Sequence, residues 1–338
     1  RRLTALIGDN GSGKTTVLQA MALVLSLATR RTRFPDEFTW HGFMADRVSS
    51  LGQTRVQLDV LLDESEITTT KELFDEWRST LSSDFLQTHH IVPPSDKSEI
   101  SLVYESGKLQ CLQGYEAQNQ FLGRYYIKAL AKAQPRLREK FSSLGDVFWF
   151  DQNRNLGTVM ASRRDAIPEE KEPSETWETG VEQLREFLVG WWGYHTSPEK
   201  RGGKDYIPEL ETHFQRVFPA TFFRGIMPRE SDGNARVSDF YFLMERAGHV
   251  FDIAEMSSGE QAVFPLLYEF VRLDIARSIV LIDELELHLH PPQQQALLAA
   301  LPKIGPDCQF VISTHSSYLE EVIPDEHEVR LEGGRLCL

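Results

Sequence analysis

Cysteine is scarce in this chain of 338 residues, and the three that occur lie far apart at Cys111, Cys308 and Cys337. An odd, scattered set of this kind forms neither a disulfide framework nor the paired spacing of a zinc site. It fits a reducing cytosol, so we expect the protein to be cytoplasmic. No run of about 18 apolar residues occurs either, and the sequence therefore predicts neither a membrane span nor a membrane partner.

Positive charge is also in short supply. The 36 lysines and arginines are outnumbered by 50 aspartates and glutamates, which gives a net charge of −14 and an isoelectric point near 5.2. Such a balance disfavours a surface that binds nucleic acid over its whole extent. Short basic clusters at residues 30–33, 163–164 and 200–204 leave room for a local patch, although each is more typical of a solvated loop or a helix end. DNA is therefore allowed as a partner but not required.

The first motif that carries chemistry is GDNGSGKTT, at residues 8–16. It matches the phosphate-binding loop G-x-x-x-x-G-K-[ST], in which glycines let backbone N–H groups converge and a helix N-terminus adds positive charge. An apolar strand at residues 3–7 precedes it and an apolar helix at 16–27 follows, as this loop requires. Lys14 is expected to reach the β- and γ-phosphates of ATP, and the Thr15 hydroxyl to hold Mg²⁺.

The loop thus predicts a bound nucleoside triphosphate with Mg²⁺, and the family resemblance described below implies that the nucleotide is ATP. The loop residues expected to bind the nucleotide are Asn10, Gly11, Gly13, Lys14, Thr15 and Thr16.

A second motif ends the apolar strand at residues 278–282 with two acids, Asp283 and Glu284. Beside a phosphate-binding loop, the first acid is expected to hold Mg²⁺ through water. The second is expected to orient and deprotonate the water that attacks ATP. The alternative is a strand that happens to end in a solvated acidic loop, but the loop at residues 8–16 favours the catalytic interpretation.

Two further motifs are weak when taken alone. Residues 255–261 (EMSSGEQ) precede an apolar helix at 262–273, and small residues at a helix start either form an anion site or simply cap the helix. Residues 310–316 (FVISTHS) predict a strand that closes in a polar turn with His315. A lone histidine is more often structural than functional.

Between these motifs the spacing of apolar residues predicts further elements. Strands are expected at 53–63 and 146–150, a β-hairpin at 100–112, and helices at 71–81, at 120–140 with a break at Pro135, and at 180–192. A stretch rich in proline, glutamate and lysine at 162–178 is typical of a mobile surface loop.

Taken in order, the motifs resemble those of the ABC ATPases, and the resemblance covers most of the chain. Gln152 stands where the family has its Q-loop glutamine, MSSGE at 256–260 is similar to the family signature LSGGQ, and His315 stands where the family has its switch histidine. The resemblance implies that two protomers enclose two ATP molecules head to tail. Ser257 and Gly259 of one chain would then touch the γ-phosphate held by the P-loop of the other.

The resemblance also implies roles for individual residues. Those implied to be catalytic are Glu284, His315 and Gln152. Those implied to hold Mg²⁺ are Thr15, Gln152 and Asp283, and those implied to contact the nucleotide across the dimer are Ser257, Gly259 and Glu260.

The implied fold is an α/β P-loop NTPase of the ABC ATPase type, with a mainly parallel core sheet flanked by helices, an antiparallel β lobe and a helical insertion. We expect one such domain over residues 1–338, with a trimmed amino terminus because the chain starts without methionine. The β lobe and helical insertion are expected at 34–145 and a helical subdomain leading to the signature at 160–250. The signature, Walker B and switch-histidine segment is expected at 251–338.

Two departures from transporter ATPases stand out. Lys14 and Gln152 are 138 residues apart, farther than a transporter subunit needs, and the sequence after Glu284 lacks the transporter pattern PTSALD. Instead, ELHLHP at 286–291 is similar to the OLD and RecF-like branch, which includes many bacterial anti-phage ATPases of the PARIS, Septu and Gabija kind. The glutamate and two histidines of this stretch could imitate a metal site, but their family position favours a structural role or one at the ATP interface.

OLD-type nucleases carry a metal-binding TOPRIM domain after the ATPase, whereas this chain stops 23 residues past His315 and has no second cluster of carboxylates. We therefore expect any effector to lie on another chain or on a segment outside this sequence. The implied function is that of a non-transport ABC ATPase that hydrolyses ATP and forms a homodimer or higher homo-oligomer around it. It would act as a switch or scaffold for a protein effector in trans, a nuclease of anti-phage defence.

Two alternatives are open. A RecF-like ATPase of DNA repair or DNA clamping would show turnover stimulated by DNA and binding that weakens with salt. The nucleotide-binding subunit of a transporter is less favoured, because of the long insertion and the HLHP loop.

Overall fold

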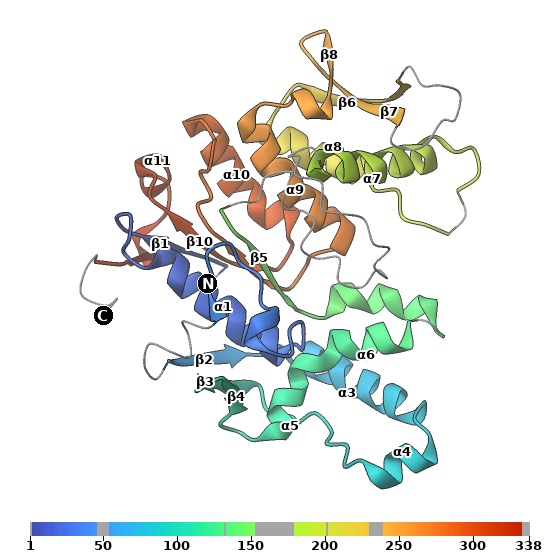
Figure 1. Cartoon of the computed structure of the whole chain (residues 1–338), viewed down its shortest axis with the longest axis vertical. Coiled ribbons are helices and arrows are strands. Elements are labelled where there is room, and N and C mark those ends of the chain that lie inside the picture. Colours follow the sequence, from blue (N-terminus) through green and yellow to red (C-terminus); the bar gives the residue numbers. More distant parts are fainter. Residues whose placement is uncertain are drawn as a thin grey trace.

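A five-stranded parallel sheet forms the centre of the molecule (Figure 1). The computed structural model describes residues 2–45, 54–131, 133–152, 179–200, 202–229 and 239–332. The strands lie in the order β11-β1-β10-β9-β5, and each neighbouring pair is parallel. Their bounds are β1 Leu3–Ile7, β5 Val147–Phe150, β9 Ile279–Ile282, β10 Gln309–Thr314 and β11 Glu328–Arg330. Four of these strands were expected from the sequence, and the mainly parallel core sheet is confirmed.

Helices cover both faces of this sheet, because successive side chains of a strand point to opposite faces. On one face, Leu6 and Leu281 pack in a core with helix α1 (Lys14–Ala28). On the other face, Ile282 and Ile312 pack in the largest core with three helices: α8 (Ile207–Val217), α9 (Ser258–Leu273) and α10 (Pro291–Ile304). Burial on both faces explains why the core strands are continuously apolar.

The predicted antiparallel lobe and helical insertion are confirmed. The lobe is a sheet in the order β2-β3-β4, with bounds β2 Arg55–Leu61, β3 Glu99–Glu105 and β4 Lys108–Cys111. It packs against the face of α1 that points away from the core sheet (Figure 1). The insertion consists of α3 (Glu64–Ser79), α4 (Ser83–Thr88), α5 (Tyr115–Gln118) and α6 (Gly123–Leu130). None of the helices in the described part of the chain is long and apolar enough to cross a bilayer.

Two helix boundaries differ from the sequence prediction. The helix expected at 71–81 begins at Glu64, because the side chain of Asp63 caps it by accepting a 2.8 Å hydrogen bond from the Ser65 N–H. The helix expected at 120–140 is three pieces: a 3-10 turn at 119–122, α6, and a 3-10 helix at 135–143. The last break falls at Pro135, as expected from its missing N–H.

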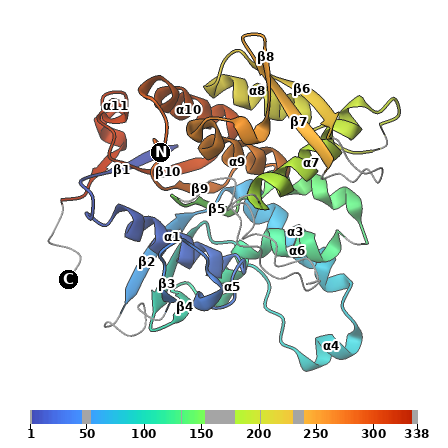
Figure 2. The same cartoon turned by 45° about the horizontal axis from the view of Figure 1, so that its top comes forward.

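The segment at 160–250, which we expected to be helical, also contains a sheet. Helices α7 (Thr179–Thr196) and α8 are present, but β6 (Thr221–Pro228), β7 (Phe240–Arg246) and β8 (His249–Asp252) form an antiparallel sheet. The alternation of buried and exposed residues along β6 is the physical reason, since it suits a sheet with one covered face. Figure 2 shows this sheet beside α7 and α8, at the opposite end of the molecule from the β2-β3-β4 sheet. The surface loop predicted at 162–178 lies outside the described residues.

Candidate nucleotide site

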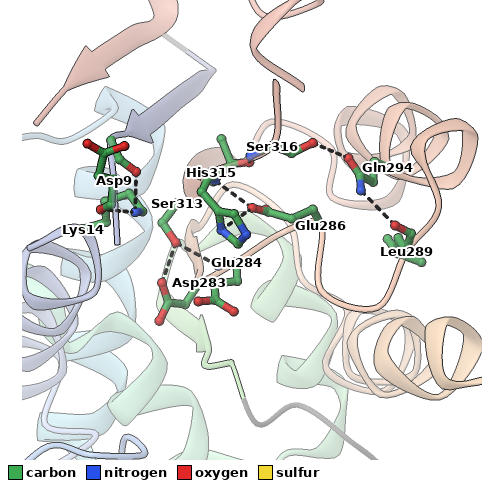
Figure 3. Close-up of polar contacts among 12 residues, drawn as sticks. Asp9, Lys14, Asp283, Glu284, Glu286, Leu289, Gln294, Ser313, His315 and Ser316 are labelled. Atoms are coloured by element: carbon green, nitrogen blue, oxygen red, sulfur yellow. Dashed lines mark hydrogen bonds and ion pairs between the residues drawn. The ribbon is translucent and has the colours of Figure 1, made fainter. Parts of the chain in front are cut away.

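Four core strands end at the same edge of the sheet, because parallel strands all run in one direction. The P-loop follows β1, Gln152 follows β5, Asp283 and Glu284 follow β9, and His315 follows β10. The register aligns the last residues of β1 with β10 and of β5 with β9. Segments far apart in the sequence are therefore brought together where the sequence predicted one site (Figure 3).

The P-loop is shaped by its glycines. Gly11 and Gly13 have left-handed backbone conformations, with φ of 82° and 93°, which residues with a side chain rarely adopt. At Gly8 a Cβ atom would lie 2.5 Å from the Leu331 carbonyl oxygen and 2.8 Å from Ser12 Oγ, so no side chain fits. Gly13 is the N-cap of α1, so the loop ends at the N-terminus of that helix. The positive end of the helix dipole therefore lies beside the loop, where it favours a bound anion.

Lys14 lies inside the curve of the loop. Its side chain is buried, and Nζ donates hydrogen bonds of 2.7 Å to the Gly8 carbonyl and 3.0 Å to the Asp9 carbonyl (Figure 3). The loop thereby holds an ammonium group on two of its carbonyl oxygens, next to the N-terminus of α1, and both the charge and the helix end suit a phosphate. Three other predicted contacts of the nucleotide are exposed beside it: Asn10, Gly11 and Thr16.

Thr15 and Asp283 join the two nucleotide motifs. Thr15 Oγ1 lies 3.1 and 2.9 Å from the two carboxylate oxygens of Asp283, across 268 residues of sequence. A hydroxyl beside a carboxylate is the pair of hard oxygen ligands that suits Mg²⁺ on a nucleotide. Among the described residues, no cluster of three histidines, cysteines or acids could hold a metal by itself. Mg²⁺ on a nucleotide keeps several waters and phosphate oxygens, so two protein ligands of this kind suffice.

Ser313, which the sequence analysis did not single out, fixes both acids. Its hydroxyl donates to Asp283 Oδ1 at 2.5 Å and accepts from the Glu284 N–H at 2.8 Å. Glu284 itself has a left-handed backbone, with φ of 48°. A residue with a side chain pays about 1 to 2 kcal/mol for that conformation. Such strain persists where the surrounding structure fixes it, often at functional sites.

His315 lies just past β10, and about half of its side chain is exposed. Its Nδ1 atom is 2.9 Å from an oxygen of Glu286, a buried residue of the loop after β9. Gln152 is half-buried at the end of β5, one residue after Asp151, whose carboxylate accepts a 3.0 Å hydrogen bond from the His41 N–H. Both residues therefore follow the carboxyl ends of core strands, on the same edge of the sheet as the P-loop.

The signature residues form the N-terminus of α9. Ser257 and Glu260 make a capping box: the Ser257 N–H and hydroxyl donate to Glu260 Oε2 at 3.0 and 2.7 Å. The other oxygen of Glu260 pairs with Arg246, and the side chain is fully buried. In this arrangement the carboxylate of Glu260, which we expected to contact nucleotide, caps the helix and binds within its own chain.

Gly259 is buried while Ser257 and Ser258 are exposed. A Cβ atom at position 259 would lie 2.8 Å from the His288 carbonyl oxygen and 3.2 Å from Leu289 Cδ2. The signature therefore rests on the loop that follows Glu284 in the same chain. This contact could not be foreseen from the sequence, because both partners are defined only by the packing of α9.

Comparison with known proteins places the chain among ATPases. The profile of the AAA_21 family, described as "AAA domain, putative AbiEii toxin, Type IV TA system", matches residues 3–178 and 199–320. The retron Vc95 probable ATPase of Vibrio cholerae is 21% identical over 359 residues, which cover 96% of this chain and 68% of that protein. The OLD nuclease of Thermus scotoductus is 25% identical over 336 residues, covering 95% of this chain and 56% of the nuclease.

A second retron protein and a solved structure give more limited similarity. The retron Ec83 probable ATPase of Escherichia coli is 32% identical over 105 residues, 28% of this chain and 19% of that protein. The structure of an Smc head bound to the C-terminal winged-helix domain of ScpA has a TM-score of 0.48 and 15% identity, covering 94% of this chain and 83% of that one.

Proposed function

Because the chain belongs to the AAA_21 family of AAA domains, we propose that it binds ATP with Mg²⁺ at the P-loop and hydrolyses ATP there. The observation that carries this proposal is the contact between Thr15 and Asp283. It joins the P-loop to the acidic end of β9, the two motifs that together bind the phosphates and Mg²⁺ in a nucleotide site. Mg²⁺, when bound, neutralises charge on the β- and γ-phosphates, and Thr15 and Asp283 would hold it.

Each residue of the edge has a proposed task. Lys14 and the N–H groups of the P-loop bind the β- and γ-phosphates and orient the γ-phosphate. Glu284 takes a proton from the attacking water, and Gln152 and His315 contact that water or the γ-phosphate from the neighbouring strands. The left-handed turn at Glu284 supports this assignment, because Asp283 is fully buried against Thr15 and Ser313 whereas the next residue, Glu284, is only half-buried.

We further propose that two copies of the chain enclose two ATP molecules head to tail. The exposed start of α9 at Ser257 and Ser258 supports this arrangement. The positive end of the helix dipole lies there and favours an anion brought by another chain. Closure of the dimer would then depend on ATP, and opening on its hydrolysis.

The output of this switch is proposed to be control of a partner effector, a nuclease in anti-phage defence. Relatives named as retron ATPases and as an OLD nuclease support the proposal, and the chain spans 68% of the retron Vc95 ATPase and 56% of the OLD nuclease. Both proteins therefore contain further sequence beyond the matched part. An acidic chain is also better suited to bind a protein than to coat DNA.

The ATPase activity is tested with Lys14→Ala and Glu284→Gln. We expect each variant to lower kcat by about 100-fold or more, since each removes a group that acts on the transition state. Lys303→Ala, which removes an exposed lysine at the end of α10, is the matched control and should leave turnover unchanged. Turnover by the Lys14 variant at the rate of the natural protein would overturn the proposal.

The dimer and its partner are tested by native mass spectrometry. Glu284→Gln with ATP and Mg²⁺ should accumulate a dimer that carries two nucleotides, and adding Ser257→Ala should reduce that species. A Glu284→Gln protein that stays monomeric with ATP would contradict the head-to-tail dimer. Turnover that rises with DNA, and falls again as salt is added, would instead favour a DNA-clamp ATPase.

A further inference from the structure

A carboxylate that the catalytic assignment does not use lies directly beside the switch histidine. Glu286 is only 7% exposed, and its Oε1 atom receives two contacts from one residue. The backbone N–H of His315 donates to it at 2.7 Å, and the ring Nδ1 of His315 lies 2.9 Å from it (Figure 3). The same oxygen therefore fixes both the main chain and the side chain of His315.

This geometry selects one tautomer of the ring. A carboxylate only accepts hydrogen bonds, so Nδ1 must donate and must carry the proton. The neutral ring then has its lone pair on Nε2, at the opposite edge of the imidazole. About half of the His315 side chain is exposed, so the ring is anchored on one side and accessible on the other. An orienting carboxylate plays the same part towards a catalytic histidine in hydrolases that use a serine nucleophile.

The two loops that carry this pair are also tied together beyond it. Gln294, at the start of α10, donates to the Leu289 carbonyl at 2.8 Å and accepts from the Ser316 hydroxyl at 2.6 Å. Gln294 and Ser316 are both buried. The turn after β10 is thereby attached to the loop after β9 at His315 and to α10 at Ser316. The backbone that carries the ring cannot move away without breaking these hydrogen bonds.

We propose that Glu286 is a positioning residue for ATP hydrolysis. It holds His315 as the Nδ1–H tautomer, with Nε2 directed to the γ-phosphate, and it acts on the reaction only through that ring. This inference rests on the proposed ATPase function. It adds a second glutamate to the site with a role distinct from that of Glu284, since Glu286 is buried and engaged with His315 while Glu284 faces the attacking water.

The test is a double-mutant cycle between positions 286 and 315. Glu286→Ala should lower kcat about tenfold and leave the KM for ATP within twofold, because orientation of a catalytic group affects the transition state more than binding. In the background of His315→Ala, the same substitution should change kcat by less than twofold. A purely structural role would give the same loss in both backgrounds, and that result would overturn the proposal.

Two further measurements keep the test decisive. Glu286→Gln keeps a side chain of the same length with an accepting oxygen, so it should recover most of the kcat lost in Glu286→Ala. Glu321→Ala is the control, because it removes an exposed glutamate and should leave kcat unchanged. Nitrogen-15 spectra of the histidine rings, with His315 assigned by its substitution, should show a proton on Nδ1 in the neutral ring of the natural protein. A proton on Nε2 would overturn the proposal without any variant at position 286.

The outcomes also separate this inference from the proposed function. If Lys14→Ala and Glu284→Gln abolish turnover but the cycle shows no coupling, only the role of Glu286 is wrong. If Lys14→Ala has the turnover of the natural protein, the proposed ATPase site is wrong as well.

Discussion

Gly259 and His288 are packed so closely that there is no room for a Cβ atom at position 259. A Cβ atom there would lie 2.8 Å from the His288 carbonyl oxygen. Gly259 lies in the first turn of α9, where any residue has a suitable backbone, so space alone demands glycine. His288 has a left-handed backbone, with φ of 59°, which limits how far its carbonyl can move.

Gly259→Ala should therefore destabilise the protein by about 1 to 3 kcal/mol, the usual cost of overpacking. It should also displace the loop that carries Glu286, and so lower kcat. Ser258→Ala is the matched control, since Ser258 is exposed and a neighbour in the same turn. Chemical unfolding followed by fluorescence would measure both variants, and equal stability of the two would refute the packing argument.

Asp283→Asn should lower kcat by about 100-fold or more while the fold is retained. The amide keeps the size of the side chain, and the oxygen that receives the Ser313 hydroxyl can remain. It loses the negative charge that Mg²⁺ requires beside Thr15. A titration with Mg²⁺ by calorimetry in the presence of a non-hydrolysable ATP analogue should show weakened metal binding, and Asp325→Asn, an exposed aspartate, should bind as the natural protein does.

Asp252→Ala should cost about 3 to 5 kcal/mol of unfolding free energy, because it removes a buried carboxylate that pairs with a buried guanidinium and accepts two backbone N–H groups. Asp252 and Arg185 are 2.6 Å apart, and their side chains are 7% and 4% exposed. The same carboxylate accepts the N–H groups of Phe242 and Ala254. Arg2→Ala breaks an exposed ion pair and should cost no more than about 1 kcal/mol. Comparable losses in the two variants would contradict this account.

Glu66→Gln should make stability less dependent on pH. Burial raises the pKa of Glu66 above its ordinary value of 4.5, although its side chain accepts the Gly145 N–H at 2.9 Å. The folded protein therefore binds this proton more tightly than the unfolded chain. Its contribution to stability is complete below pH 4.5 and is lost as pH rises through the raised pKa.

Unfolding measured from pH 4 to 8 should show a decline in the natural protein that is smaller in Glu66→Gln. Glu72→Gln, at an exposed position of the same helix, should follow the natural protein. A Glu66 variant with the full decline would show that another group is responsible.

The sequence predicted those parts of the site whose chemistry is contained in a short stretch. Lys14 and Thr15 belong to a loop whose shape is set by glycines within the same nine residues. Asp283 and Glu284 directly follow a continuously apolar run, which predicts a buried strand. Ser313 and Gln294 were missed because their partners Asp283 and Ser316 are 30 and 22 residues away, and only the sheet order and the packing of α10 bring them into contact.

The sheet at residues 221–252 was missed for a different reason. From the sequence we expected a helical subdomain at residues 160–250 and no strand within it. Glycine 225 and the bulge between Phe223 and Gly225 also interrupt the period of two that identifies a strand. At the start of α9 the sequence identified Gly259 but not the residue that it contacts. That residue, His288, is brought to Gly259 by tertiary packing alone.

The position of β1 between β10 and β11 has a consequence for how the protein is made. The ribosome produces the P-loop first, but both neighbours of β1 in the sheet come from residues 309–330. The Leu331 N–H then closes on the Ile7 carbonyl at 2.8 Å, directly before Gly8. During synthesis the strand before the P-loop must therefore stay unpaired until residues 309–330 have been made. The ability to bind nucleotide should emerge only once those residues have left the ribosome, and it would then report that the core sheet is assembled.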